Sequence, residues 1–122
     1  MGTFSVGITV ASVNGGVSQP IMALVDTAAS FTVVPGSLLR HLDVVPTRTR
    51  TPSYANGQQA ALDMAEIKAT VEGQEATTWA IFGEDESGEA LLGAVILQEL
   101  LLGVDTLNER LVPVQGLLKQ TG

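Results

Sequence analysis

The 122-residue sequence predicts a mostly β domain with one or two short helices. Apolar and polar residues alternate with a period of two over residues 4–10 and again over residues 65–71, as in strands that bury one face. The 13 glycines and 5 prolines are spread along the chain, which indicates many tight turns. At this length we expect one domain, residues 1–122.

The composition excludes several classes of function. The chain has no cysteine and one histidine, which excludes disulfides, a cysteine nucleophile and a multi-histidine metal site within one chain. The formal net charge is −7, and the longest basic cluster is Arg48-Thr49-Arg50, so we expect no nucleic-acid binding. No apolar stretch approaches the ~20 residues of a membrane span, and the N-terminus does not read as a signal peptide. We therefore expect no membrane association and a cytoplasmic location.

In the N-terminal half, the first strand ends at Asn14-Gly15-Gly16, residues that favour a tight hairpin turn. A second strand over residues 20–25 is apolar on both faces, which predicts a central position in the sheet. A short strand at residues 31–34 leads into a short helix at residues 35–42, whose leucines form a buried face.

The middle of the chain predicts two consecutive hairpins. Residues 47–62 are polar and turn-rich around Asn56-Gly57, a strong hairpin signal between extended arms. The strand over residues 65–71 turns at Glu72-Gly73-Gln74 into a partner over about residues 76–82. Trp79 lies on that partner strand, and we expect it in the core.

The C-terminal part begins with an acidic surface loop at residues 83–89, which lacks the ligand spacing of a calcium site. Residues 90–93 predict a short buried strand that stops at glycine. A helix over residues 95–102 follows, with Gly103 as its C-terminal stop. Residues 104–114 predict strand, tight turn and strand, and the tail at about 115–122 is expected to be mobile.

One segment carries the functional signal. The apolar strand Ala23-Leu24-Val25 leads directly into Asp26, and small or hydroxyl-bearing residues follow it, Thr27, Ala28, Ala29 and Ser30. Taken alone, Asp26 also fits a turn aspartate that ends a buried strand. A second Val-Asp-Thr, at residues 104–106, precedes Leu-Asn-Glu-Arg, and there Asp105 and Asn108 suit an ordinary hairpin turn.

The segment 26–30 resembles the active-site loop of retropepsin-like aspartic proteases, Asp-Thr-Gly-Ala-Ser, with Ala28 in the place of the glycine. The likeness to the small bacterial and archaeal members extends over about residues 7–114. Three further motifs occur in the order and spacing of the family: a flap tip at Ala55-Asn56-Gly57, Leu91-Leu92-Gly93 before a helix, and the ending at residues 104–113. Each motif alone is weak, and the four together are specific.

The resemblance implies an acid-protease barrel that contributes half of an active site, and a homodimer that completes it. The Asp26 side chains of the two chains would share one proton, because two carboxylates so close together cannot both ionise, and the pair would activate a water molecule. Thr27 to Ser30 would support the loop, and Leu91, Leu92 and Gly93 would pack beneath it. The flap hairpin (about residues 47–71) would close over an extended polypeptide substrate through its tip, Tyr54, Ala55, Asn56, Gly57 and Gln58. No metal or organic cofactor is needed.

The resulting hypothesis is a homodimeric aspartic endopeptidase. The alternative from another class is a catalytically weak or inactive module that keeps the protease fold for dimerisation or peptide binding. Ala28 is the feature that favours this alternative, because its methyl group lies where the family brings two backbones close together.

Overall fold

The computed structural model describes residues 4–50, 61–84 and 89–114. The strands are β1 (Ser5–Ser12), β2 (Ser18–Val25), β3 (Thr32–Pro35), β4 (Arg48–Arg50), β5 (Leu62–Val71), β6 (Gln74–Gly83), β7 (Ala90–Leu92), β8 (Leu102–Asp105) and β9 (Arg110–Pro113). The helices are α1 (Gly36–His41) and α2 (Ala94–Glu99). The mostly β class with two short helices is therefore confirmed.

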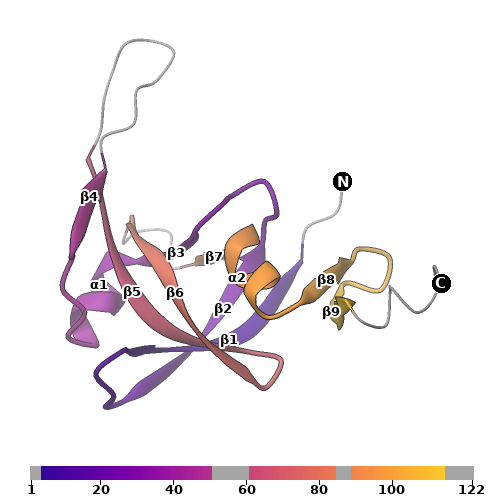
Figure 1. Ribbon diagram of the computed structural model, residues 1–122, viewed down its shortest axis with the longest axis horizontal. Coiled ribbons are helices and arrows are strands. Elements are labelled where there is room, and N and C mark those ends of the chain that lie inside the picture. The colour runs from indigo at the N-terminus through magenta and orange to yellow at the C-terminus, as the bar shows by residue number, and fades with distance from the viewer. Residues whose placement is uncertain (1–3, 51–60, 85–88, 115–122) are drawn as a thin grey trace, which may run out of the picture.

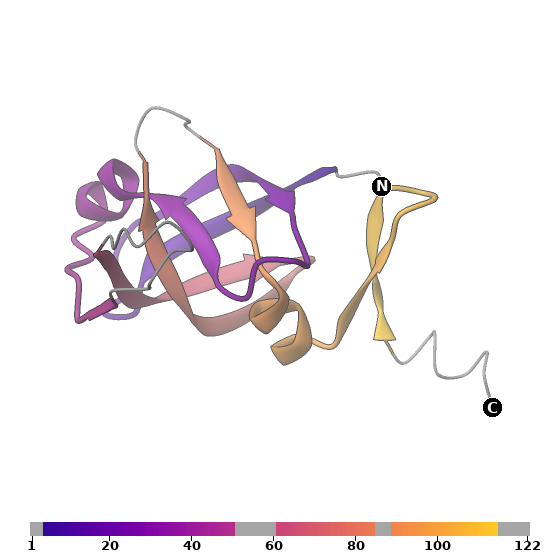
Figure 2. The same ribbon diagram turned by 90° about the horizontal axis from the view of Figure 1, so that it is seen from above.

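Six of these strands close into a barrel (Figures 1 and 2). The neighbours follow the order β1-β2-β7-β3-β6-β5, and β1 also pairs with β5, which closes the sheet on itself. The strand β4 extends the sheet by pairing with the N-terminal end of β5, residues 62–64. As expected, β2 is central, because it lies between β1 and β7.

The turns have the chemistry that the sequence predicts. Gly15 and Gly16 join β1 to β2 with φ angles of 89° and 99°, which glycine adopts at little cost. Glu72 and Gly73 join β5 to β6 with φ angles of 51° and 77°, as in a two-residue hairpin turn with positive φ at both positions. These two hairpins fix the register of the long strands.

The barrel interior is filled by one face of each strand. On β5, Ile67, Ala69 and Val71 are buried, in agreement with the predicted alternation. On β6 the buried residues are Thr78 and Ala80, so Trp79 lies on the opposite face and is only half-buried. The predicted core position of Trp79 was therefore wrong, since the smaller side chains of β6 face inward.

The two helices cap the barrel. The helix α1 buries Leu39, and the following Leu42 is also buried, as predicted. The helix α2 ends at Glu99, and Leu101 takes the positive φ of 55° that follows it. The prediction that Gly103 ends this helix was wrong, because Gly103 belongs to β8 and pairs with Val112.

The strands β8 and β9 form a separate two-stranded sheet (Figure 2). This hairpin lies at the end of the molecule away from α1, as Figures 1 and 2 both show. Its turn exposes 89% of Leu107. In the part of the chain that the structure describes, no helix is long and apolar enough to cross a membrane.

Candidate active site

Asp26 directly follows β2 and is held by a neighbouring strand. Its backbone N–H donates to the carbonyl oxygen of Leu92 at 3.0 Å, which continues the parallel pairing of β2 with β7 beyond Val25. The side chain of Asp26 is half-buried. The buried strand therefore delivers one carboxylate to the edge of the barrel, in the position that the sequence predicts.

The residues after Asp26 form a tight turn around its carboxylate. The N–H of Ala28 donates to Oδ1 of Asp26 at 3.0 Å, and the N–H of Ala29 donates to the carbonyl oxygen of Asp26 at 3.1 Å. An aspartate that accepts from the N–H two residues later fixes its own side-chain direction. The carboxylate is thus oriented by the loop itself, with Thr27 and Ser30 exposed nearby.

Ala28 fits the loop without backbone strain. Among the described non-glycine residues, positive φ angles occur only at Asp43, Glu72, Leu101 and Glu109. Ala28 is exposed and lies outside the left-handed region that would favour glycine. Within one chain, the methyl group of Ala28 is therefore accommodated.

The loop 26–30 rests directly on the segment that joins β7 to α2. The N–H groups of Ala94 and Val95 donate to the carbonyl oxygens of Ala29 and Ser30 at 2.8 and 3.0 Å. A Cβ atom on Gly93 would lie 2.6 Å from the carbonyl carbon of Phe31 and 2.7 Å from the carbonyl oxygen of Ser30. Real Cβ contacts are not this short, so only glycine fits at position 93.

Thr32 completes this support and was missed by the sequence analysis. Its side chain is 1% exposed, and its hydroxyl oxygen accepts from the N–H of Gly93 at 3.2 Å. A buried N–H needs such a partner, since leaving it unpaired costs free energy. The available signal was a hydroxyl residue between Phe31 and two valines in an otherwise apolar strand.

The described residues place a single carboxylate in this loop. Asp105 lies in the β8–β9 hairpin, where its carboxylate accepts from the backbone N–H and the side-chain amide of Asn108 at 3.2 and 2.9 Å. The Nε atom of Arg110 lies 3.3 Å from Oδ2 of Asp105. These hydrogen bonds hold the pKa of Asp105 below its ordinary value of 3.8. Its interpretation as a turn aspartate agrees with this geometry. Asp63 instead accepts from the hydroxyl of Thr49 at 3.0 Å.

The structure therefore brings some of the predicted site residues together, and others lie outside the residues that it describes. The structure brings the loop 26–30 together with Leu92 and Gly93, while Leu91 pairs with Leu24 beside them. The predicted flap tip, Tyr54 to Gln58, lies outside the described residues, although β4 and β5 at the base of the hairpin are described. No group of three or more His, Asp or Glu side chains that could hold a metal ion occurs within the described ranges.

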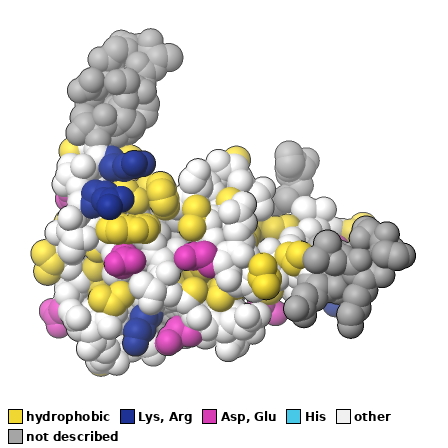
Figure 3. Space-filling model, in the orientation of Figure 1, with side chains coloured by type: hydrophobic (Ala, Val, Ile, Leu, Met, Phe, Trp, Pro, Cys, Tyr) yellow, Lys and Arg dark blue, Asp and Glu magenta, His cyan; other side chains and the backbone are white. Residues whose placement is uncertain are grey.

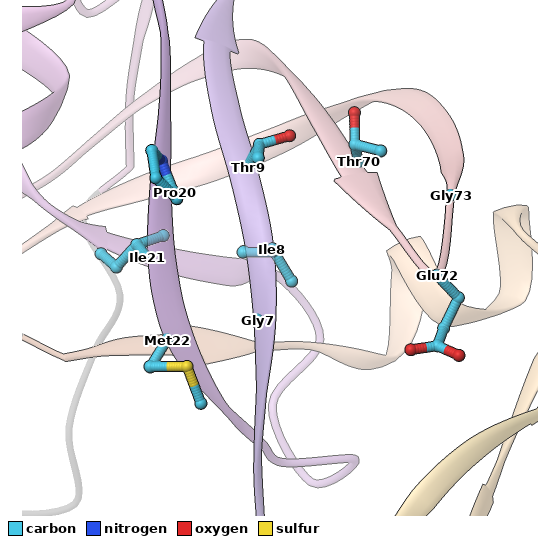
Figure 4. Close-up of a pocket in the computed structure, with 9 residues that line it drawn as sticks. All are labelled: Gly7, Ile8, Thr9, Pro20, Ile21, Met22, Thr70, Glu72 and Gly73. Carbon is cyan, nitrogen blue, oxygen red and sulfur yellow. The ribbon is translucent and has the colours of Figure 1, made fainter.

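An open pocket on the outer surface of the barrel is separate from this site. It lies between β1, β2 and the β5–β6 turn, and Gly7, Met22, Thr70 and Glu72 are among its lining residues (Figure 4). No residue of the loop 26–30 lines it. The pocket is therefore not part of the candidate active site.

Comparison with solved structures agrees with this fold. Two solved structures are similar: the Simian Foamy Virus (mac) protease, with a TM-score of 0.57 and 18% identity over 77% of this chain and 93% of that one, and the EIAV protease complexed with the inhibitor HBY-793. The EIAV protease has a TM-score of 0.54 and 17% identity, covering 91% of this chain and 93% of that one. The fold is thus that of the retropepsin-like proteases.

The sequence comparison identifies the family. Residues 9–106 match the aspartyl protease family, so the chain belongs to it. This match covers the loop with Asp26, the strands β4 and β5, and the segment around Gly93. No curated protein sequence matches the chain.

Proposed function

We propose that two copies of this chain form an aspartic endopeptidase that hydrolyses peptide bonds of extended polypeptides. Hydrolysis by carboxylates requires one ionised group to take a proton from water and one protonated group to polarise the carbonyl. The loop 26–30 supplies one such carboxylate. A two-fold axis beside Asp26 would bring the second from the other copy, and the pair would share one proton.

The conformation of the active-site loop is the observation that carries this proposal. Asp26 is oriented by the N–H of Ala28, and the loop rests on the backbone of Gly93. Positions that must meet a second carboxylate need such rigid support, since small displacements of reacting groups are costly in catalysis. Thr27 is exposed beside Asp26 and is available for hydrogen bonding to the other copy.

The β8–β9 hairpin supports dimerisation. It packs on the core through Leu102 and Leu111, and among the described residues β8 and β9 pair only with each other, so each strand has one unpaired edge. Strand edges of this kind pair readily with another chain. We therefore place the contact between the two copies at this hairpin as well as at the loop 26–30.

The first test measures assembly and hydrolysis together. Sedimentation across a concentration series should show a monomer–dimer equilibrium, and hydrolysis of a peptide library at mildly acidic pH should follow the dimer fraction. A statine-type transition-state mimic should inhibit it. Hydrolysis that is proportional to total chain at concentrations where only monomer exists would contradict the shared site.

A mixing experiment tests whether each active site needs both copies. Asp26→Asn retains the oxygen that accepts from the N–H of Ala28, so this variant should fold and dimerise. When it is mixed with an equal amount of wild type and the subunits exchange, about one quarter of the dimers should stay active. If the mixture keeps half of the activity of the same total amount of wild type, each chain acts alone and the proposal is wrong.

The alternative function is a protease-fold module that binds peptides without cleaving them. Ala28 in place of the motif glycine is the observation that favours it. In that case, the purified dimer would hydrolyse nothing in the library, and Asp26→Asn would bind the same peptides as the wild type.

A further inference from the structure

The strand register defines a continuous row of side chains across the outside of the barrel, from β2 to β4. Residues that are partners in adjacent strands point to the same face of a sheet. The partners in this row are Leu24 with Leu91, Leu91 with Val33, Val33 with Ile81, Ile81 with Met64, and Met64 with Arg48.

The row begins beside the candidate active site. Asp26 lies two residues after Leu24, and its N–H bond to Leu92 continues the strand pairing, so both side chains share one face. Leu24 and the next three residues of the row are half-buried, although they lie outside the core. An apolar surface of moderate exposure therefore leads from the loop 26–30 to the base of the flap hairpin.

Arg48 ends this row, where it stacks on Trp79. The guanidinium carbon of Arg48 lies 4.4 Å from the centroid of the indole ring, within the range of a cation–π contact. The contact passes over β5, because Arg48 is on β4 and Trp79 is on β6. Met64 lies beneath, 1% exposed. The indole thus packs against the guanidinium at the end of the row.

Among the described residues, no ion pair uses the hydrogen-bond donors of Arg48. Within residues 4–50, 61–84 and 89–114, no carboxylate lies within 4.0 Å of its guanidinium nitrogens. Glu66 is on the same face, opposite Trp79, but does not reach Arg48. A planar guanidinium that is already oriented by an aromatic ring binds a carboxylate with two parallel hydrogen bonds.

The local charge differs from that of the whole chain. The formal net charge is −7, yet Arg48 and Arg50 both lie on this face of β4. Figure 3 shows Lys and Arg side chains gathered beside hydrophobic ones over the β4 end of the sheet, with acidic side chains farther along. A negatively charged group would be attracted to this end of the row.

We propose that Arg48, held on Trp79, binds an acidic side chain of the polypeptide substrate, whose extended backbone lies along the apolar row. This inference rests on the proposed function, because it names a specificity-determining residue for the same active site. Five strand spacings of ~4.8 Å separate Leu24 from Arg48 along the sheet, and an extended peptide rises ~3.3 Å per residue. The acidic residue should therefore lie within about seven residues of the cleaved bond.

The test uses binding to the full-length Asp26→Asn chain, so that it does not depend on hydrolysis. Two pools of tryptophan-free peptides of about fourteen residues, long enough to cover the row, carry either Glu or Gln at one scanned position. Trp79 is the only tryptophan in the sequence, so its fluorescence reports on binding at Arg48. At one position or more, we expect the Glu pool to bind roughly threefold to tenfold more tightly than the Gln pool.

Variants then identify the group responsible. Adding Arg48→Gln to the Asp26→Asn chain should remove the preference for Glu and leave the affinity for the Gln pool unchanged. Arg48→Lys keeps the charge without the planar donors and should lose part of the preference. Lys68→Gln is the matched control, because Lys68 lies on the same face of β5 at a distance from the row and should leave the preference intact.

Each result has a clear meaning. The proposal is overturned if the Glu pool binds no better than the Gln pool, if Arg48→Gln weakens both pools equally, or if Lys68→Gln has the same effect. Should Arg48→Gln fail to fold, Arg48→Lys is used instead, and an undiminished preference for Glu in that variant overturns the proposal. If the preference for Glu is observed while the wild-type chain hydrolyses nothing, the endopeptidase proposal fails and the role of Arg48 in binding stands.

Discussion

The backbone N–H of Gly93 lies 3.2 Å from the hydroxyl oxygen of Thr32, a buried hydrogen bond between residues 61 positions apart. It joins the strand after the loop 26–30 to the turn before α2. Beside it, the backbone of Gly93 is so close to Ser30 and Phe31 that no side chain fits. The position of Asp26 therefore depends on a contact between two segments that are distant in the sequence.

Gly93→Ala should destabilise the protein and displace the loop 26–30. The new methyl group would meet backbone atoms of Ser30 and Phe31 at 2.6 to 2.7 Å, and backbone cannot move aside as a flexible side chain can. Such overpacking costs typically about 1–3 kcal/mol. Chemical denaturation measures the loss of unfolding free energy. Gly7→Ala is the control, since its Cβ would meet only the sulfur of Met22, at 3.9 Å, and a stability loss of equal size there would contradict this account.

Thr32→Val should remove the hydrogen bond to Gly93 and leave a buried N–H unpaired. A loss of this kind costs about 1–3 kcal/mol of unfolding free energy, although threonine and valine have nearly the same shape. Thr32→Ser keeps the hydroxyl and should retain the hydrogen bond, at the cost of one methyl group. Thermal and urea unfolding of the two variants would separate these effects. If the Thr32→Ser variant is no more stable than the Thr32→Val variant, the hydrogen bond does not have the stabilising role proposed here.

Ala28→Gly should change hydrolysis by no more than a few-fold. Ala28 is not in the left-handed region, so glycine relieves no strain in the folded chain. The greater freedom of glycine in the unfolded chain should cost about 0.4–1 kcal/mol of stability. Measurement of kcat/KM with a cleaved library peptide tests the first point. A large gain in activity with glycine would show that the methyl group obstructs the meeting of two copies.

Asp105→Asn should change how stability depends on pH. The hydrogen bonds from Asn108 hold the pKa of Asp105 below 3.8 in the folded chain, so the folded state favours the ionised form. This contribution is present above the unfolded value of 3.8 and is lost as the pH falls through the lower folded value. The difference in unfolding free energy between wild type and variant should therefore shrink below about pH 4. A constant difference from pH 7 to pH 2 would rule out this role of Asp105.

Much of the barrel could be predicted because its signals are local. The alternation over residues 65–71 predicts β5, and Glu72-Gly73 predicts the turn into β6, where both φ angles are positive. The placement of Trp79 failed for a physical reason. A period of two defines two faces of β6, and it does not say which face turns inward until the facing strands are known.

The end of α2 shows the same limit. Gly103 was the natural stop for a helix, yet Leu101 takes the positive φ and Gly103 pairs with Val112 in the β8–β9 hairpin. Packing of Leu100 and Leu102 into the core sets where the chain leaves the helix. Tertiary contacts can therefore override a local preference for glycine.

The sequence by itself determined the strands, most of their turns and the one carboxylate that a buried strand delivers, Asp26. These features depend on residues that are neighbours in the chain. Only the tertiary structure decided that Gly93 and Thr32 support the loop and that Arg48 stacks on Trp79 at the end of an apolar row leading from it. Those contacts follow from the closure of the barrel, which places side chains from separate strands next to one another.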